Sequence, residues 1–208
     1  QRAGDSAPGG RGEGLSRPLL GMVLLSAFLT GGPCGPGFSH LTVLYTSAGF
    51  SSGTAALLMS YLGLVLIAAK VLYGWLSDRL GSRMANSLIF GVFLAGFALC
   101  CLAPTRSLPL AAAAITLTGL GMPLSSVTLS VWAGDLSAPE DYDRLVKWLS
   151  SAYMLGSLVT GPVPGLLADR FGGSYVPAYG LFLFFLLISM LLIQTVYRRT
   201  GVGGRPQR

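Results

Sequence analysis

Long apolar runs separated by short polar turns occupy most of the sequence between residues 19 and 197. Each run has about the 20 residues that a helix needs to cross a bilayer, and glycine, proline and charged residues mark the turns. The predicted spans are Leu19–Tyr45, Thr54–Trp75, Ala85–Ala103, Pro109–Ala133, Trp148–Ala168 and Pro177–Tyr197. This pattern predicts an all-α membrane protein with six transmembrane helices.

The composition supports a membrane protein and excludes most soluble classes. Of 208 residues, 52% are hydrophobic and only 11% are charged, whereas a soluble domain carries about 25% charged residues. The three cysteines lie inside apolar runs and show no CxxC spacing, so we expect no metal site, no disulfide framework and no cofactor. We divide the chain into a flexible arm or linker (1–17), a helical bundle (18–198) and a basic tail (199–208).

Basic residues predict the orientation in the membrane. Six helices place both termini on one side, and eleven of the 14 Lys and Arg residues fall on that side. These are Arg2, Arg11, Arg17, Arg79, Arg83, Arg144, Lys147, Arg198, Arg199, Arg205 and Arg208, while Arg106 and Arg170 fall opposite. The excess predicts cytoplasmic termini. We also expect the protein to reside in the plasma membrane. The basic residues form no cluster with aromatics among them, so we expect no nucleic-acid partner.

Two stretches share the pattern G-x-L-small-D-R-x-G. The first ends the second predicted helix and contains Gly74, Asp78, Arg79 and Gly81; the second ends the fifth and contains Gly165, Asp169, Arg170 and Gly172. Three helices separate the two stretches, so they fall on opposite sides of the membrane. This spacing predicts a 3+3 inverted repeat, the building block of many secondary transporters.

The first of these stretches points to a family. G-W-L-S-D-R-L-G-S-R at 74–83 resembles the cytoplasmic signature loop of the major facilitator superfamily. The stretches 39–51, 70–79 and 161–175 extend the likeness, so that nearly all of 19–197 resembles a carboxyl-terminal six-helix half. The branch it resembles is monocarboxylate-transporter-like and oxalate/formate-antiporter-like. The resemblance implies a symporter or antiporter, not an enzyme, that moves a small organic anion by alternating access.

The resemblance also implies a latch at the signature loop. Asp78 would face a helix N-terminus in the other half, an interaction of about 0.3–1 kcal/mol. Arg79 and Arg83 would be its basic neighbours, and Gly74 and Gly81 would allow the tight turn. The alternative is an ordinary loop with interfacial charges.

Lys70 is the one basic residue inside a predicted helix. A lysine there costs about 2.5–3.5 kcal/mol, which makes it a functional candidate. Because side chains lean toward the N-terminus of their helix, Lys70 leans toward the membrane centre, and we favour a cavity cation over snorkelling. The branch it resembles has an arginine four residues before the equivalent of Gly74, where it binds a substrate carboxylate. Proton-coupled members have an acidic residue at the position of Leu66. The second cation that oxalate-type antiporters carry in the span matching the fifth is absent too, so the resemblance implies a monoanion rather than a dianion.

Further candidates surround this cation. His40 on the first helix, and Tyr61 and Tyr73 on the second, are expected to line the same cavity. The first helix also contains a Gly/Pro run that predicts a break: Gly31, Gly32, Pro33, Gly35, Pro36 and Gly37. Broken helices at mid-depth line transport sites in some proteins, whereas in others a kink only shapes packing; both readings stay open.

Two other classes remain as alternatives. Gly49-Phe-Ser51-Ser-Gly53 matches the G-x-S-x-G pattern of a rhomboid-like serine protease, but the single histidine, His40, precedes the serine, and the segment also reads as a helix cap. The third class is a non-transporting membrane fragment or scaffold. We favour a truncated carboxyl-terminal half over a natural half-size protein, with a missing six-helix half or a second copy as partner.

Overall fold

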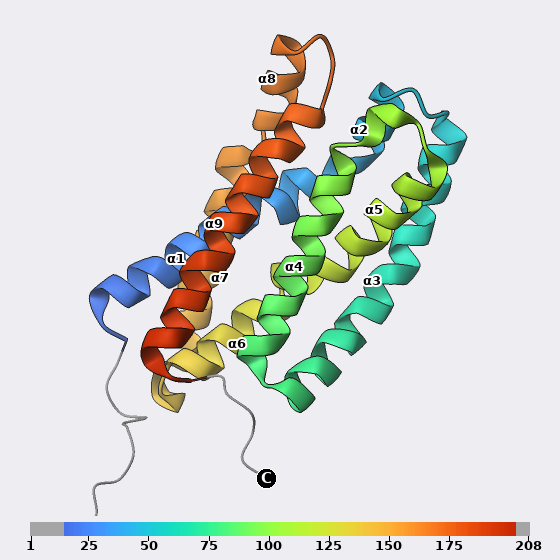
Figure 1. Ribbon diagram of the computed structural model, residues 1–208. Helices are drawn as coiled ribbons and strands as arrows, with labels where there is room; N and C mark the ends of the chain where they lie inside the picture. Colours follow the sequence, from blue (N-terminus) through green and yellow to red (C-terminus); the bar gives the residue numbers. More distant parts are fainter. Residues whose placement is uncertain (1–14, 203–208) are drawn as a thin grey trace, which may run out of the picture.

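Helices make up nearly all of residues 15–202, the part of the chain that the computed structural model describes (Figure 1). The first half contains α1 (Arg17–Gly32), a π-helical turn (Pro33–Gly37), α2 (Leu41–Ser47), α3 (Ser52–Leu80) and α4 (Ser82–Cys100). The second contains α5 (Leu108–Gly121), a 3-10 turn (Met122–Ser125), α6 (Val127–Leu136), α7 (Tyr142–Thr160), α8 (Val163–Arg170) and α9 (Val176–Thr200). Most of the expected arm and tail lies outside the described residues.

Five helical segments of residues 15–202 are long and apolar enough to cross a membrane. They are Arg17–Gly37, Ser52–Leu80, Ser82–Cys100, Leu108–Ser125 and Val176–Thr200. They overlap five of the six predicted spans, with different ends. The first ends at Gly37, before the separate α2, and α3 runs on to Leu80 instead of ending at Trp75. The fourth ends at Ser125, and the rest of the predicted Pro109–Ala133 span lies in α6. An all-helical fold is therefore confirmed for the described residues, with five segments that suit a membrane.

The predicted fifth span, Trp148–Ala168, is not one continuous helix. It is divided between α7 and α8 by a turn at Gly161 and Pro162. Proline has no N–H for the helical ladder, so the turn falls where the sequence places Pro162. A six-helix bundle built as an inverted repeat therefore goes beyond what these five spans show.

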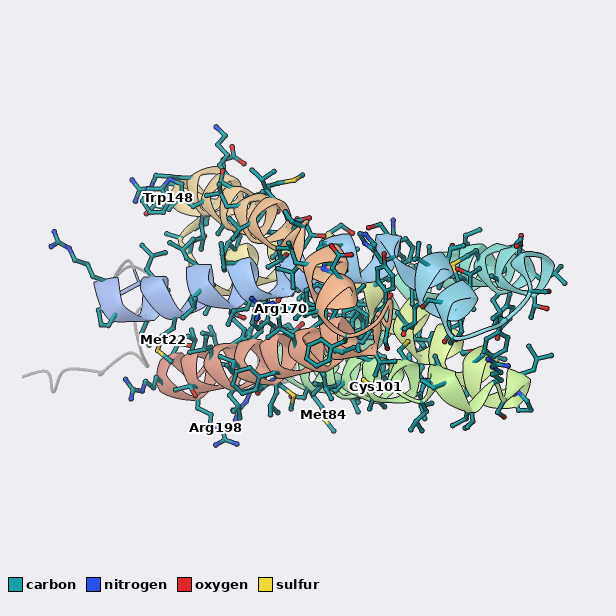
Figure 2. All side chains as sticks on the ribbon, turned by 90° about the horizontal axis from the view of Figure 1, so that it is seen from above. Met22, Met84, Cys101, Trp148, Arg170 and Arg198 are labelled. Carbon is teal, nitrogen blue, oxygen red and sulfur yellow. The ribbon has the colours of Figure 1, made fainter. Side chains whose placement is uncertain are left out.

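The α1 helix lies between α7 and α9, and α4 packs on α5 and α9. Figure 2, seen from above, shows α7 and α9 on either side of α1, with Arg198 pointing away from the bundle. The α1–α7 contact is made backbone to backbone: a side chain on Gly31 would meet the main chain of Tyr153 and Ser157, and one on Gly156 would meet the Phe28 carbonyl. Small residues permit such close approach, which is how helices associate without a hydrophobic driving force in lipid.

Candidate functional site

The α3 helix exposes two chemically different stripes on either side of one buried stripe. Its buried residues recur every three or four positions, at Ala55, Leu58, Leu62, Val65, Ala69 and Tyr73. One exposed or half-exposed stripe consists of Ser52, Ala56, Ser60, Gly63, Ile67, Lys70, Gly74 and Asp78. The other consists of Leu57, Tyr61, Leu64, Ala68, Leu72 and Trp75. We call them the polar stripe and the apolar stripe.

Lys70 lies on the polar stripe and is exposed. Within residues 15–202, its side chain makes no hydrogen bond and no ion pair, since the salt bridge found there joins Arg144 to Asp141 at 3.2 Å. Asp78, the carboxylate on the same stripe, lies eight residues on, or about 12 Å along the axis. Lys70 is thus a cation without a counterion from the described chain.

Tyr61 does not join Lys70. The two residues are nine positions apart, which at 3.6 residues per turn places them about 180° apart around the helix. The Tyr61 hydroxyl instead pairs with the Thr116 hydroxyl of α5 at 2.9 Å.

Tyr73 does not reach an exposed surface, which corrects its expected place beside Lys70. Its side chain is fully buried, and its hydroxyl donates to Asn86 Oδ1 of α4 at 2.7 Å. The sequence reasoning assigned Tyr73 from helical proximity alone, because the direction of an aromatic ring depends on the neighbouring helices. It also missed Asn86, although a buried amide inside an apolar helix is itself a signal.

His40 lies at the other end of α3 from Lys70, in the turn just before α2. Its Nδ1 lies 2.8 Å from the Pro36 carbonyl oxygen, and its ring stacks on Tyr175 with centroids 6.0 Å apart. Since Lys70 lies 18 residues into α3, about 27 Å from the start of that helix, the two side chains do not share a site.

The Gly/Pro run of the first span is a π-helical turn inside the bundle. Of its glycines and prolines, all but the half-buried Gly35 are buried. Tyr179 donates its hydroxyl to the Gly37 carbonyl at 2.7 Å, and Gly32 and Gly37 lie against the Phe182 ring. The Gly37 carbonyl oxygen is therefore satisfied by an interior side chain, and the Pro36 carbonyl oxygen by Ser39 and His40. This favours the reading in which the kink shapes packing.

The signature loop (74–83) contains one tight turn, which we call the signature turn, and a single glycine forms it. Gly81 has φ 82° and ψ 152°, a conformation that is essentially restricted to glycine, and it alone separates α3 from α4. Gly74 lies within α3 with no heavy atom within 4 Å of an added side chain, so it does not shape the turn, contrary to expectation.

The charged residues of the signature turn point in different directions. Asp78 is exposed on the polar stripe, while the Arg79 guanidinium lies over the Trp75 ring of the apolar stripe, 4.9 Å from its centroid. Arg83 is half-buried in the first turn of α4. No ion pair joins Asp78 to either arginine within the described part of the chain.

The second copy of the motif forms a comparable turn at the opposite end of the bundle. After α8, Gly172 and Gly173 take φ 63° and 85°, three and four residues beyond Asp169, just as Gly81 follows Asp78 by three. Asp169 and Arg170 are exposed, and Gly165 lies in α8 with open space around it. Figure 1 shows the α8–α9 turn at the top and the α3–α4 turn at the bottom.

Ser51 is a helix cap. Its Oγ accepts a hydrogen bond from the Thr54 backbone N–H at 3.1 Å, which is the usual N-cap contact. Its hydroxyl pairs with that of Thr54, while the one imidazole in the chain, His40, pairs with Pro36. Among the described residues, no three His, Cys, Asp or Glu side chains gather where they could hold a metal ion.

Helices suited to span a membrane, an exposed and unpaired lysine within one of them, and a repeated Asp-Arg turn point to the class of multi-pass integral membrane transporters. The comparison with protein families agrees: the profile of the Major Facilitator Superfamily matches residues 16–207. The chain belongs to this superfamily, which is a class of transporters and not of enzymes, as the resemblance implied.

The relatives of this chain include monocarboxylate transporter 12 from several vertebrates. The rat (Rattus norvegicus) and human (Homo sapiens) proteins are each 28% identical over 162 residues, which is 77% of this chain and 33% and 31% of those proteins. The Xenopus laevis protein is 25% identical over 189 residues, which is 86% of this chain and 39% of that protein. The chain thus spans only about a third of the length of these relatives.

Proposed function

We propose that this chain is the carboxyl-terminal half of a secondary active transporter that moves a small organic anion, such as a monocarboxylate, by alternating access. Three things support this: membership of a transporter superfamily, the names of the relatives, and the polar stripe of α3. Residues 1–17 would then be a linker, 18–198 a six-helix inverted repeat that includes the divided α7–α8 span, and 199–208 a tail.

The observation that carries the proposal is the exposed, unpaired Lys70 on a stripe whose other residues, apart from Ile67, are small or polar. Against lipid tails, a lysine would cost about 2.5–3.5 kcal/mol, while the apolar stripe on the other side of α3 suits lipid well. Lys70 lies ten residues before the end of α3, about 15 Å along the axis. Its side chain also leans away from that end, which disfavours snorkelling.

A carboxylate is the ligand that Lys70 lacks. A monocarboxylate would supply the counterion, and Gly63 and Gly74, which lie one to two turns away on the same stripe, leave room beside the ammonium. An ammonium is a point donor without the bidentate fork of a guanidinium, so the site would recognise charge more than carboxylate geometry. The stripe offers no second cation, which fits a monoanion.

The polar stripe would face the other half of the transporter. Asp78 ends this stripe, so it is placed to meet a helix N-terminus of that half in one conformational state. A contact of about 0.3–1 kcal/mol biases a two-state equilibrium without locking it. In this arrangement the α3–α4 turn and both termini are cytoplasmic, and the protein resides in the plasma membrane.

The test is Lys70→Gln in the complete transporter that contains this chain, reconstituted in liposomes with radiolabelled acetate, pyruvate and lactate as probes. Losing one charge-assisted contact of about 1.5–3 kcal/mol lowers uptake at low substrate by about 10- to 100-fold. Lys70→Arg keeps a cation and is expected to keep much of the uptake. Arg144→Gln, which removes a surface cation, is the matched control. Wild-type uptake by Lys70→Gln, at equal membrane insertion, would refute the role of Lys70.

A further inference from the structure

A chain of hydrogen bonds, buried except at its half-buried Asp135 end, joins four helices next to the signature turn. Tyr73 of α3 donates its hydroxyl to Asn86 Oδ1 of α4 at 2.7 Å, and Asn86 Nδ2 donates to the Tyr197 hydroxyl of α9 at 3.3 Å. Tyr197 in turn donates to Asp135 Oδ2 of α6 at 2.6 Å. We call these four residues the four-helix junction.

Every donor in the four-helix junction points the same way, toward Asp135. The Asp135 carboxylate oxygen accepts the hydrogen bond that the Tyr197 hydroxyl donates, which leaves the phenol oxygen free to accept from the Asn86 amide. The amide oxygen then accepts from Tyr73. Tyr73, Asn86 and Tyr197 are fully buried, so removing one member leaves its neighbours unpaired in the interior, where they find no water.

The four-helix junction holds both arms of the signature turn. Tyr73 lies eight residues before Gly81, and Asn86 lies five residues after it. Lys70 lies about one helical turn before Tyr73 on α3, and Asp78 about one turn after it. The remaining partners, Asp135 and Tyr197, lie in the last turns of α6 and α9.

A second contact shows what the four-helix junction adds. Gln194 of α9 donates to the Ser87 hydroxyl of α4 at 2.6 Å, so α4 and α9 remain joined without the junction. Of the side-chain hydrogen bonds in residues 15–202, only those of the junction link α3 to α4, α6 and α9. The junction is therefore the hydrogen-bonded connection of α3, the helix that carries Lys70 and Asp78, to these three helices, and the Tyr61–Thr116 pair joins α3 to α5.

We propose that Asn86 and Tyr197 are positioning residues, which through the four-helix junction fix the place of α3, and with it Lys70 and Asp78, against α6 and α9. The consequence of this positioning for transport rests on the proposed function of Lys70. The position of α3 itself does not, and it is measured separately.

The first measurement is a distance between spin labels on the full chain in lipid nanodiscs. Labels go on exposed Val71 of α3 and exposed Arg198 of α9, with Cys101 replaced by Ser, because Cys34 and Cys100 are buried. One narrow distance distribution is expected. Tyr197→Phe, which removes one oxygen and keeps the ring, should broaden it, as should Asn86→Leu if that variant folds.

Matched variants separate positioning from general loosening. Ser189 joins α9 to Ser26 and Thr30 of α1 through buried hydroxyls at 2.7 and 2.8 Å and does not touch α3. Ser189→Ala should therefore leave the α3–α9 distance unchanged. Asp135→Asn keeps an acceptor oxygen and should preserve the distribution, whereas Asp135→Leu should broaden it.

An unchanged distribution in Tyr197→Phe would overturn the proposal, and so would equal broadening in Ser189→Ala. In the complete transporter, Tyr197→Phe should raise the KM for the monocarboxylate about 5- to 10-fold at equal protein level, as expected when one buried group loses its partner. Ser189→Ala should not raise it. If Lys70→Gln leaves uptake intact, the proposed function fails, while the distance measurement still decides the role of the four-helix junction.

Discussion

The close contact between α1 and α7 makes Gly156→Ala the most direct test of the packing. A Cβ at Gly156 would overlap the carbonyl group of Phe28, and that obstacle is backbone that cannot rotate away. Gly31 occupies the facing position, where a Cβ would lie 2.6 Å from the Ser157 nitrogen. The contact therefore depends on the absence of a side chain on both helices.

Two opposing terms set the size of the effect. Alanine favours the helix over glycine by about 0.5–1 kcal/mol. Against this, the two helices must separate by about 1 Å, which forfeits a quarter to a half of the dispersion energy of the atoms that face each other. Overpacking of this kind costs about 1–3 kcal/mol, so we expect Gly156→Ala to lower the free energy of unfolding by about 1–2 kcal/mol.

The assay is thermal unfolding of the chain in detergent micelles, followed by circular dichroism. For a chain of this length, the expected loss lowers the Tm by about 2–8 °C. The control is Gly91→Ala: Gly91 is exposed within α4, and an added Cβ meets no heavy atom within 4 Å, so only helix propensity acts. A Gly156→Ala variant as stable as Gly91→Ala would refute the backbone-to-backbone contact.

The remaining predictions concern the signature turn and the orientation. Gly81→Ala forces alanine into a conformation that only glycine adopts readily, and it should lower the free energy of unfolding by about 1–3 kcal/mol. Gly74→Ala lies inside α3 with open space around it, and it should leave the free energy of unfolding unchanged or raise it by up to about 1 kcal/mol. Equal effects of the two variants in thermal unfolding would contradict the assignment of the turn to Gly81. For the orientation, Thr105→Cys lies in the α4–α5 turn and should react with a membrane-impermeant thiol reagent on intact cells. Glu140→Cys, between α6 and α7, should react only after permeabilisation, and the reverse pattern would overturn the proposed cytoplasmic termini.

The site residues show where sequence reasoning succeeded and where it stopped. The Gly81 turn, its counterpart at Gly172 and the Ser51 cap depend on residues within a few positions of each other, so local chemistry predicted them. Lys70 is a candidate because a charge in an apolar run is conspicuous, and its role stays a prediction. Tyr73 was placed wrongly, and Asn86, Asp135 and Tyr197 were overlooked, because their hydrogen bonds join residues up to 111 positions apart.

The sequence by itself determined the class of protein, five of the six predicted spans and the repeated Asp-Arg turn. Hydropathy, turn glycines and motif spacing are properties of neighbouring residues, and a bilayer leaves an apolar run of 20 residues few alternatives to a helix. Only the tertiary structure decided which way each side chain points. It buried Tyr73, separated Tyr61 from Lys70, filled the π-turn of the first span with aromatic neighbours and divided the fifth span at Pro162. Each of these outcomes depends on which helices pack together, and in lipid that choice follows from close fit and paired polar groups, which hydropathy does not encode.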